Sequence, residues 1–149
     1  MDKFDDMMRL LKEKEATPGS FGQVIAVDRK FELFERAWCV AEIAEASKSR
    51  IHPFLKAASS ESINDNFEKI EKLDVEDCEA SRQQDKDYIL EKIKKDTTVK
   101  LFNEELRRII GGIAFRWTQA ENIRLKSENS ELRSRVVLPP EGPPGSISQ

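Results

Sequence analysis

The chain has 149 residues, of which 38% are hydrophobic and 36% are charged, and its net charge is −3. That length is sufficient for one domain with a hydrophobic core, and the high charged fraction favours long solvated helices over a β-sandwich. The acidic balance gives no indication of general nucleic-acid or anionic-membrane binding, and no apolar run approaches the roughly 20 residues that span a bilayer.

The N-terminal part of the sequence predicts a short amphipathic helix and then a strand. In the helix, expected over residues 2–15, apolar side chains recur at helical spacing on one face: Phe4, Met7, Met8 and Leu11. The turn-forming residues 17–20 end this helix. Residues 21–28 form a short, apolar, β-branched run, so we expect a buried strand there.

A helix and a second strand are expected next. After a loop, the helix carries Trp38 and Glu42, and residues 51–57 then predict a short second strand. Pro53 favours a strand start or a sheet edge, because proline lacks a backbone N–H. A strand, a helix and a second strand in this order are typical of a parallel α/β arrangement.

Two sequences of the capping-box type predict the starts of two further helices. In residues 62–65 and 81–84 a serine is followed three residues later by Asp or Gln, the pattern in which a serine caps the helix and the later side chain reaches back to it. The side chains expected to face inward are Phe67, Ile70 and Leu73 in the first helix and Tyr88, Ile89 and Ile93 in the second.

A long helix is predicted from residue 97 onward. Its apolar side chains make one continuous stripe: Phe102, Leu106, Ile109, Ile113, Trp117 and Ala120. Two adjacent glycines cost about 2 kcal/mol relative to alanine in a helix, so Gly111 and Gly112 predict a kink or a break. The Pro- and Gly-rich residues 138–149 predict a disordered tail. The chain therefore divides into an α/β part over 1–96, a long helix over 97–137 and this tail.

The end of the long helix matches a heptad repeat. The a positions are Phe115, Asn122, Asn129 and Val136, and the d positions are Thr118, Leu125 and Leu132. Glu121 and Glu128 at g would attract Lys126 and Arg133 at e of a parallel partner, and asparagine at a favours a two-stranded register. We expect this helix to bind a second copy of the chain or another protein. The alternative is a solvated helix face with i, i+4 ion pairs.

Few side chains suit catalysis or metal binding. Residues 1–6 are acidic and lack the apolar segment of a signal peptide, so the cytosol is the expected compartment and Cys39 and Cys78 are expected to be free thiols. His52 is the sole histidine, which excludes a His-based triad, and no ligand spacing supports a metal site. No glycine-rich phosphate loop follows a strand.

One block resembles a known family. The strand over 23–27, a loop and the sequence Trp38-Cys39-Val40-Ala41-Glu42-Ile43 are similar to the fourth strand and following helix of a TIR domain, most of all the TIR-like proteins of protists and algae. Further stretches resemble the same group, and they lie at 34–42, 73–75, 78–81, 85–86, 89–90 and 102–103. The resemblance extends from residue 4 to residue 110.

The resemblance implies a flavodoxin-like fold that assembles through its surfaces in signalling. Some TIR domains cleave NAD⁺ at the nicotinamide–ribose bond, and their catalytic glutamate corresponds to Glu42. A carboxylate suits this chemistry because the transition state resembles an oxocarbenium ion. Trp38 would then contact the cofactor, although a tryptophan more often anchors a core. The match covers only the C-terminal half of such a domain, and Glu35 replaces a serine common in the family, so an incomplete NAD⁺ pocket is implied.

Together these patterns predict a helix-dominated α/β fold with about two parallel strands of a partial flavodoxin-like sheet, flanking helices and a long C-terminal helix. The leading functional interpretation is a protein–protein assembly module of a TIR-like signalling protein that pairs through its C-terminal helix. The alternatives are NAD⁺ hydrolysis by Glu42 and an accessory structural role in a larger complex. For the last role we expect exposed apolar surface around Phe4, Met7, Met8 and Val24.

Overall fold

The computed structural model describes residues 3–14, 17, 20–136 and 145. They form a helix-dominated α/β fold, 68% helical, with a two-stranded parallel sheet and a long last helix, which confirms the predicted fold class. In chain order the elements are α1 (Lys3–Glu13), β1 (Gly22–Ala26), the 3₁₀ turn η1 (Glu32–Glu35), α2 (Ala37–Lys48), β2 (His52–Lys56), α3 (Ser60–Glu71), α4 (Gln83–Asp96) and α5 (Val99–Arg135). The tail expected over 138–149 lies outside the described residues except at Gly145.

The two strands pair in parallel, with Val24 opposite Phe54 and Ile25 opposite Leu55. Successive side chains of a strand point to opposite faces of the sheet. Ile25 and Leu55 point into the core and are 3% and 8% exposed, whereas Val24 and Phe54 point the other way and are 69% and 53% exposed. The sheet therefore has one buried face and one open apolar face.

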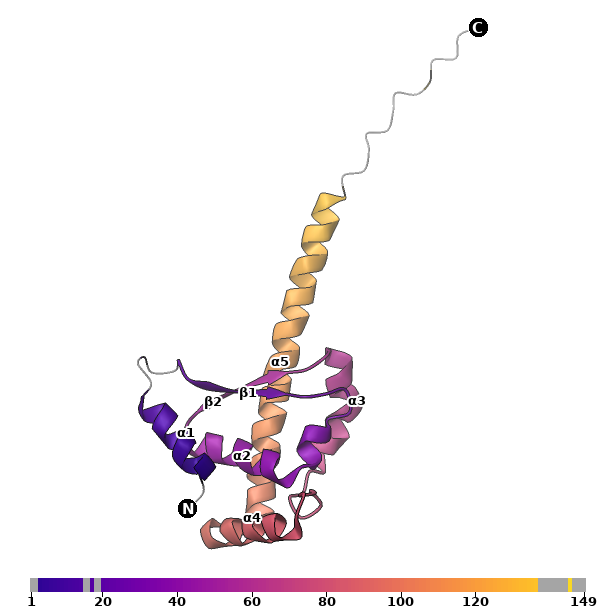
Figure 1. The fold of residues 1–149 in the computed structure, drawn as a ribbon. Helices are drawn as coiled ribbons and strands as arrows, with labels where there is room; N and C mark the ends of the chain where they lie inside the picture. Colours follow the sequence, from indigo (N-terminus) through magenta and orange to yellow (C-terminus); the bar gives the residue numbers. More distant parts are fainter. Residues whose placement is uncertain (1–2, 15–16, 18–19, 137–144, 146–149) are drawn as a thin grey trace.

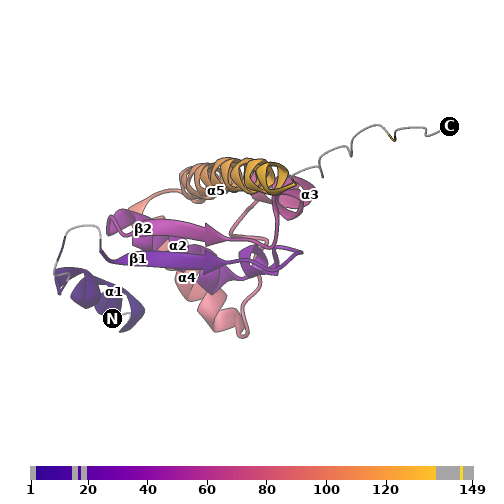
Figure 2. The same cartoon turned by 90° about the horizontal axis from the view of Figure 1, so that it is seen from above.

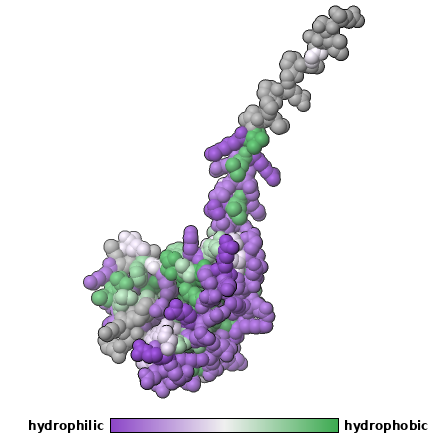
Figure 3. All heavy atoms as spheres, turned by 45° about the vertical axis from the view of Figure 1, so that its right-hand side comes forward, coloured by the Kyte–Doolittle hydropathy of each residue, from purple (hydrophilic) through white to green (hydrophobic). Residues whose placement is uncertain are grey.

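Helices cover only the buried face of the sheet. In Figure 1, α2 and α4 lie below the strands, and α5 runs at a steep angle to both strands. Figure 2 shows that α5 lies beside β2. α5 packs on α2, α3, α4 and β2. Its C-terminal part leaves the body on the side of the open face, and in Figure 3 this part is mainly hydrophilic with separate apolar patches.

The first half of α5 supplies the centre of the core. Leu106 and Ile110 are both 0% exposed, and the predicted apolar stripe is confirmed as far as Ile113. Trp117 packs against the margin of the core, and Ala120 is exposed because the helix is leaving the body at that point.

The kink expected at Gly111 and Gly112 is wrong, because α5 continues through both residues as one helix. The glycines cost about 2 kcal/mol in helix propensity. However, Ile110 and Ile113 on either side are buried, and tertiary packing of an apolar face contributes more to helix stability than propensity does. A Cβ atom on Gly111 would have no neighbour within 4 Å, so packing does not require glycine there.

The end of α2 sets the start of β2 through a Schellman motif. The Ile51 N–H donates to the Ala46 carbonyl at 2.9 Å, and the Arg50 N–H donates to the Ser47 carbonyl at 3.0 Å. Arg50 has a φ of 56°, in the left-handed region where glycine is preferred. Ala46 and Ile51 are buried together with Met8 of α1, so the apolar contact of this motif also anchors the N-terminal helix.

Both predicted capping boxes are wrong in position. The N-cap of α3 is Ser59: its hydroxyl accepts from the Ser62 N–H at 3.2 Å, and the Ser62 hydroxyl accepts from the Ser59 N–H at 3.3 Å. α4 begins at Gln83 after Arg82, without a side-chain cap. The first box was misplaced because several neighbouring serines offer a hydroxyl, and the spacing alone does not choose between them.

The predicted inward faces are only partly confirmed. Five of the expected residues are buried: Met8, Ile70, Leu73, Ile89 and Ile93. Phe67 and Tyr88 were also expected inside, but they are 43% and 44% exposed. On the predicted apolar face of α1, Met7 and Leu11 are 49% and 43% exposed. The exposed apolar surface expected around Met7 and Val24 is therefore present, whereas Met8 is buried. The side chain of Phe4 lies outside the described part of the chain. The correction follows from packing: α1, α3 and α4 each press only a narrow strip against the body, so residues beside that strip stay in contact with water.

Replacing Gly111 with alanine is expected to raise the free energy of unfolding by about 0.5–1 kcal/mol, because the new methyl group meets open space and alanine favours the helix. Urea denaturation followed by circular dichroism measures the change. Gly22→Ala is the contrasting variant and is expected to destabilise, because its Cβ would lie 2.7 Å from Cε2 of Phe54. A destabilised Gly111→Ala protein would show that α5 bends at the glycine pair in solution.

Candidate functional site

Trp38 and Glu42 lie on α2 where it packs against α4. The rings of Trp38 and Tyr88 are 6.3 Å apart and tilted by 35°, which joins the two helices. A pocket of about 40 Å³ beside Glu42 is lined by residues of α1, α2, α4 and α5 only, and two of them, Asp5 and Lys92, form an ion pair. A glutamate on the first turns of a helix that follows a parallel strand is expected at the carboxyl edge of the sheet, where α/β folds place their ligand crevices. The pocket beside Glu42 contains no residue from the end of a strand.

This pocket does not fit a dinucleotide. Small-molecule sites in proteins typically have volumes of about 300–1,000 Å³, many times the 40 Å³ beside Glu42. Trp38 packs against the core in the position expected of a structural tryptophan. The catalytic role of Glu42 stays a prediction from the resemblance to TIR domains.

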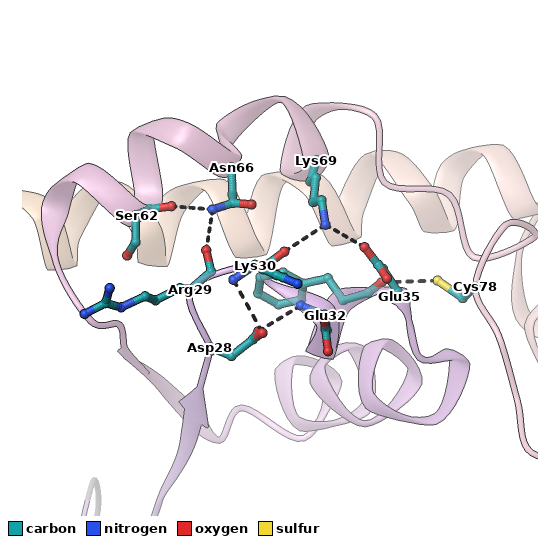
Figure 4. A network of polar contacts seen from close by, with 10 residues as sticks. Asp28, Arg29, Lys30, Glu32, Glu35, Ser62, Asn66, Lys69 and Cys78 are labelled. Atoms are coloured by element: carbon teal, nitrogen blue, oxygen red, sulfur yellow. Dashed lines mark hydrogen bonds and ion pairs between the residues drawn. The ribbon is translucent and has the colours of Figure 1, made fainter.

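A polar loop occupies the carboxyl end of β1 (Figure 4). Asp28 accepts a hydrogen bond from the Glu32 N–H at 2.9 Å and so satisfies the first N–H of η1. Between these residues, Phe31 has a φ of 58° and is 0% exposed, with its ring edge-on to Phe34 at a centroid distance of 5.7 Å. A left-handed conformation costs a non-glycine residue about 1–2 kcal/mol. The free energy gained by burying the Phe31 ring offsets this conformational cost.

α3 holds this loop from above through two side chains (Figure 4). The Asn66 amide donates to the Arg29 carbonyl at 2.8 Å, and the Lys69 ammonium donates to the Lys30 carbonyl at 2.8 Å. Lys69 also pairs with Glu35 at 2.6 Å. A groove of about 540 Å³ lies beside these groups. Because Lys69 is committed to the loop and to Glu35, the network positions the backbone after β1.

Asn66→Ala is expected to lower the free energy of unfolding by about 1 kcal/mol, because it leaves the Arg29 carbonyl without this donor. The matched control is Asn64→Ala, which removes an exposed asparagine from the same helix and is expected to change stability by less than about 0.5 kcal/mol. Urea titration of both variants measures the difference. Equal effects would show that the bond to the loop contributes nothing beyond helix propensity.

Both cysteines are free thiols, Cys39 half-buried and Cys78 buried. Cys78 is 3% exposed, and its thiol donates to the Phe34 carbonyl at 3.3 Å and the Asp74 carbonyl at 3.4 Å; burial raises its pKa to about 11. Burial also raises the pKa of Cys39, although the nearby Arg36 opposes the shift. Within the described ranges, no group of three or more His, Cys, Asp or Glu side chains is placed to hold a metal ion.

At pH 8 a disulfide reagent is expected to modify Cys39 and to leave Cys78 intact, because a thiol with a pKa of about 11 is about one-thousandth ionised at that pH. Mass spectrometry of the folded and urea-unfolded chain identifies the modified residue.

The folded pKa of Cys78 also exceeds its ordinary value of 9.0, so stability is expected to fall between pH 9 and pH 11. Cys78→Ala should lack that loss, and rapid native labelling of Cys78 would contradict its burial.

The last part of α5 is free of the body. The side chain of Glu121 is 21% exposed, whereas Leu125, Leu132 and Val136 are 42%, 59% and 71% exposed. In the predicted pairing seam, Phe115 is 64% exposed and Thr118 is partly covered, and every seam residue from Asn122 onward is exposed. This free segment, residues 122–136, projects away from the body in Figure 1.

Arg124 joins the two glutamates that were assigned to g positions. Its guanidinium lies 2.6 Å from Glu121 and 2.5 Å from Glu128. The hydrogen bond lowers the pKa of Glu121 and raises that of Arg124. Sequence reasoning missed Arg124, although its i, i+3 and i, i+4 spacing from the glutamates is a known signal. Lys126 and Arg133, the predicted partners across a pair of helices, are exposed and make no ion pair with a described residue.

The structure separates the two groups of predicted site residues. Glu42 and Trp38 lie between helices of the body, while the assigned interaction residues project on the free segment: Asn122, Leu125, Lys126, Glu128, Asn129, Leu132 and Arg133.

Comparison with known proteins found no matching family model, no similar curated protein and no similar solved structure. None of the helices in the described part of the chain is long and apolar enough to cross a membrane.

Proposed function

We propose that this chain is a protein–protein assembly module that binds its partner through the free segment of α5. The observation that carries the proposal is the exposure of Leu125, Leu132 and Val136 on a helix that has left the body. These residues are seven and four positions apart, so they form one apolar strip along the helix.

Physical reasoning favours a partner for this strip. From Asn122 to Arg135 the helix extends about 20 Å, and a helix of that length without tertiary contacts is marginal in water. The exposed ion pairs of Arg124 contribute only a few tenths of a kcal/mol each. Full burial of a leucine side chain contributes about 1.5–3 kcal/mol, so packing the strip against a second helix is the larger source of stability.

A second copy of the chain has the complementary charges. In a parallel pair, Glu128 of one copy faces Arg133 of the other, and both side chains are exposed. Glu121 and Lys126 would pair in the same way, but Glu121 is partly covered by the body. Asn129 at an a position favours the two-stranded, in-register arrangement. On pairing, Glu121 and Glu128 would replace their present ion pairs with Arg124 of the same helix, or share them with the partner helix.

The proposal includes a TIR-like signalling role in the cytosol. The signalling role is supported by the resemblance and by the parallel order of β1, the helix carrying Trp38 and Glu42, and β2. The cytosolic location is supported by the free, buried thiol of Cys78, since free cysteines are typical of reducing compartments. NAD⁺ hydrolysis is not part of the proposal because of the small pocket beside Glu42.

The double variant Leu125→Lys, Leu132→Lys is expected to convert a dimer into a monomer, because it places charges in the strip that would be buried between helices. Sedimentation over a range of protein concentrations measures the molar mass. A chain that ends at Glu121 keeps the packed half of α5 and should also be a monomer.

Ile123→Lys is the matched control. Ile123 is 67% exposed on the same free segment but falls at a b position, outside the a and d strip. This variant should still dimerise, and circular dichroism should show an intact fold in all three proteins. A wild-type monomer at every concentration would contradict self-pairing, and equal dissociation by Ile123→Lys would show that the assigned register is wrong.

A further inference from the structure

A second surface of this chain is open: the outer edge of β1. β1 pairs with β2, and no other strand belongs to the sheet in the described part of the chain. α5 packs beside β2, so β2 is covered on its outer side. β1 turns Ile25 into the core, and β2 is its one strand neighbour among the described elements. A two-stranded sheet is marginal by itself, and parallel sheets normally have both faces covered.

The hydrogen-bonding groups at this edge follow from the pairing. The Val27 N–H donates to the Lys56 carbonyl at 2.9 Å, so Val27 directs its backbone groups towards β2. Backbone groups of successive strand residues point to opposite sides. Ile25 therefore also bonds towards β2, while the N–H and C=O groups of Val24 and Ala26 point to the outer edge. Such a row of donors and acceptors accepts an extended strand.

β1 has none of the residues that usually protect an exposed edge. Natural edge strands carry lysine, proline or bulges that prevent pairing. β1 reads Gly22-Gln23-Val24-Ile25-Ala26 and has no charge and no proline, whereas β2 contains both Pro53 and Lys56. The exposed side chains of Val24 and Phe54 lie side by side on the open face and provide apolar contacts next to the edge.

The loop after β1 adds charge to this edge. The backbone carbonyls of Arg29 and Lys30 are held by α3, which fixes where these residues lie (Figure 4). Their side chains are exposed, and neither forms an ion pair with any residue that the structure describes. The neighbouring carboxylate of Asp28 accepts from the Lys30 N–H at 3.4 Å and the Glu32 N–H at 2.9 Å. Arg29 and Lys30 can therefore offer their charge to an acidic group at the carboxyl end of β1.

We propose that the outer edge of β1 binds an extended segment of a partner protein, with apolar residues at alternate positions and acidic residues at the end that lies beside Arg29 and Lys30. Main-chain hydrogen bonds to Val24 and Ala26 hold the segment, and its apolar side chains pack on Val24 and Phe54. A second copy of this chain fits less well, because Asp28, the acidic residue that follows its β1, is already engaged within its own loop by the N–H groups of Lys30 and Glu32. This surface is independent of the helix pairing on α5.

Hydrogen exchange of the full chain tests the open edge. The amides of Val24 and Ala26 are expected to exchange rapidly, and those of Ile25 and Val27 slowly, because only the latter bond to β2. Equal protection of all four amides would overturn the proposal, since the edge would then already be covered. Protection of Val24 that rises with protein concentration would assign the edge to a second copy and would overturn the choice of partner.

Selection of a random peptide library on the full chain tests the occupant. Peptides with alternating apolar residues and an acidic end are expected to be enriched, and they should protect the Val24 and Ala26 amides. Val24→Pro removes the outward N–H without a loss of bonds to β2 and should weaken binding by about tenfold or more, while Val24→Thr, which keeps the N–H, should weaken it less.

A charge reversal keeps the test valid if the proline variant does not fold. The double variant Arg29→Glu, Lys30→Glu changes exposed side chains and leaves the carbonyls that α3 holds. It should lose the acidic peptides and gain peptides with basic ends. No enriched peptide, or enriched peptides that bind both variants as well as the wild type, would overturn the proposal.

Discussion

The fold depends on one packing surface, the apolar stripe in the first half of α5. Leu106 and Ile110 are completely buried at its centre, and four other elements pack around this half of the helix. A two-stranded sheet has too little area to organise a core by itself. The first half of α5 is therefore the structural centre of the fold. Its packing keeps α5 helical through Gly111 and Gly112.

Much of this architecture could be predicted from local patterns. β1 follows from a short β-branched run, β2 from the short apolar segment at 51–57, and the buried half of α5 from its 3.6-residue periodicity. Periodicity gave less reliable results where a helix presses only a narrow strip to the body. Tyr88 has the same spacing as buried Ile89 and Ile93, yet it borders α2 at the rim and stays 44% exposed.

The candidate site was harder to predict because it depends on the relative placement of distant segments. A glutamate early in a helix after a strand predicts a sheet-edge position for Glu42, but α4 packs over that part of α2 and encloses it. The loop at the carboxyl end of β1 is held in place by Asn66 and Lys69, which lie 37 and 39 residues along the chain from the carbonyls to which they donate. No local pattern marks such residues. The heptad in the free segment of α5 is a local pattern, and its role in pairing stays a prediction.

The unbroken path of α5 from the core into solvent has a geometric consequence for assembly. A helix turns by about 100° and advances by about 1.5 Å with each residue. The azimuth of the apolar strip around the axis is therefore locked to the orientation of the sheet. One residue inserted between Glu121 and Leu125 would leave the core intact and rotate the strip to another flank of the body. If two copies pair through this strip as proposed, the mutual orientation of their bodies depends on the number of residues along a stiff helix, and a flexible linker of equal length would not preserve it.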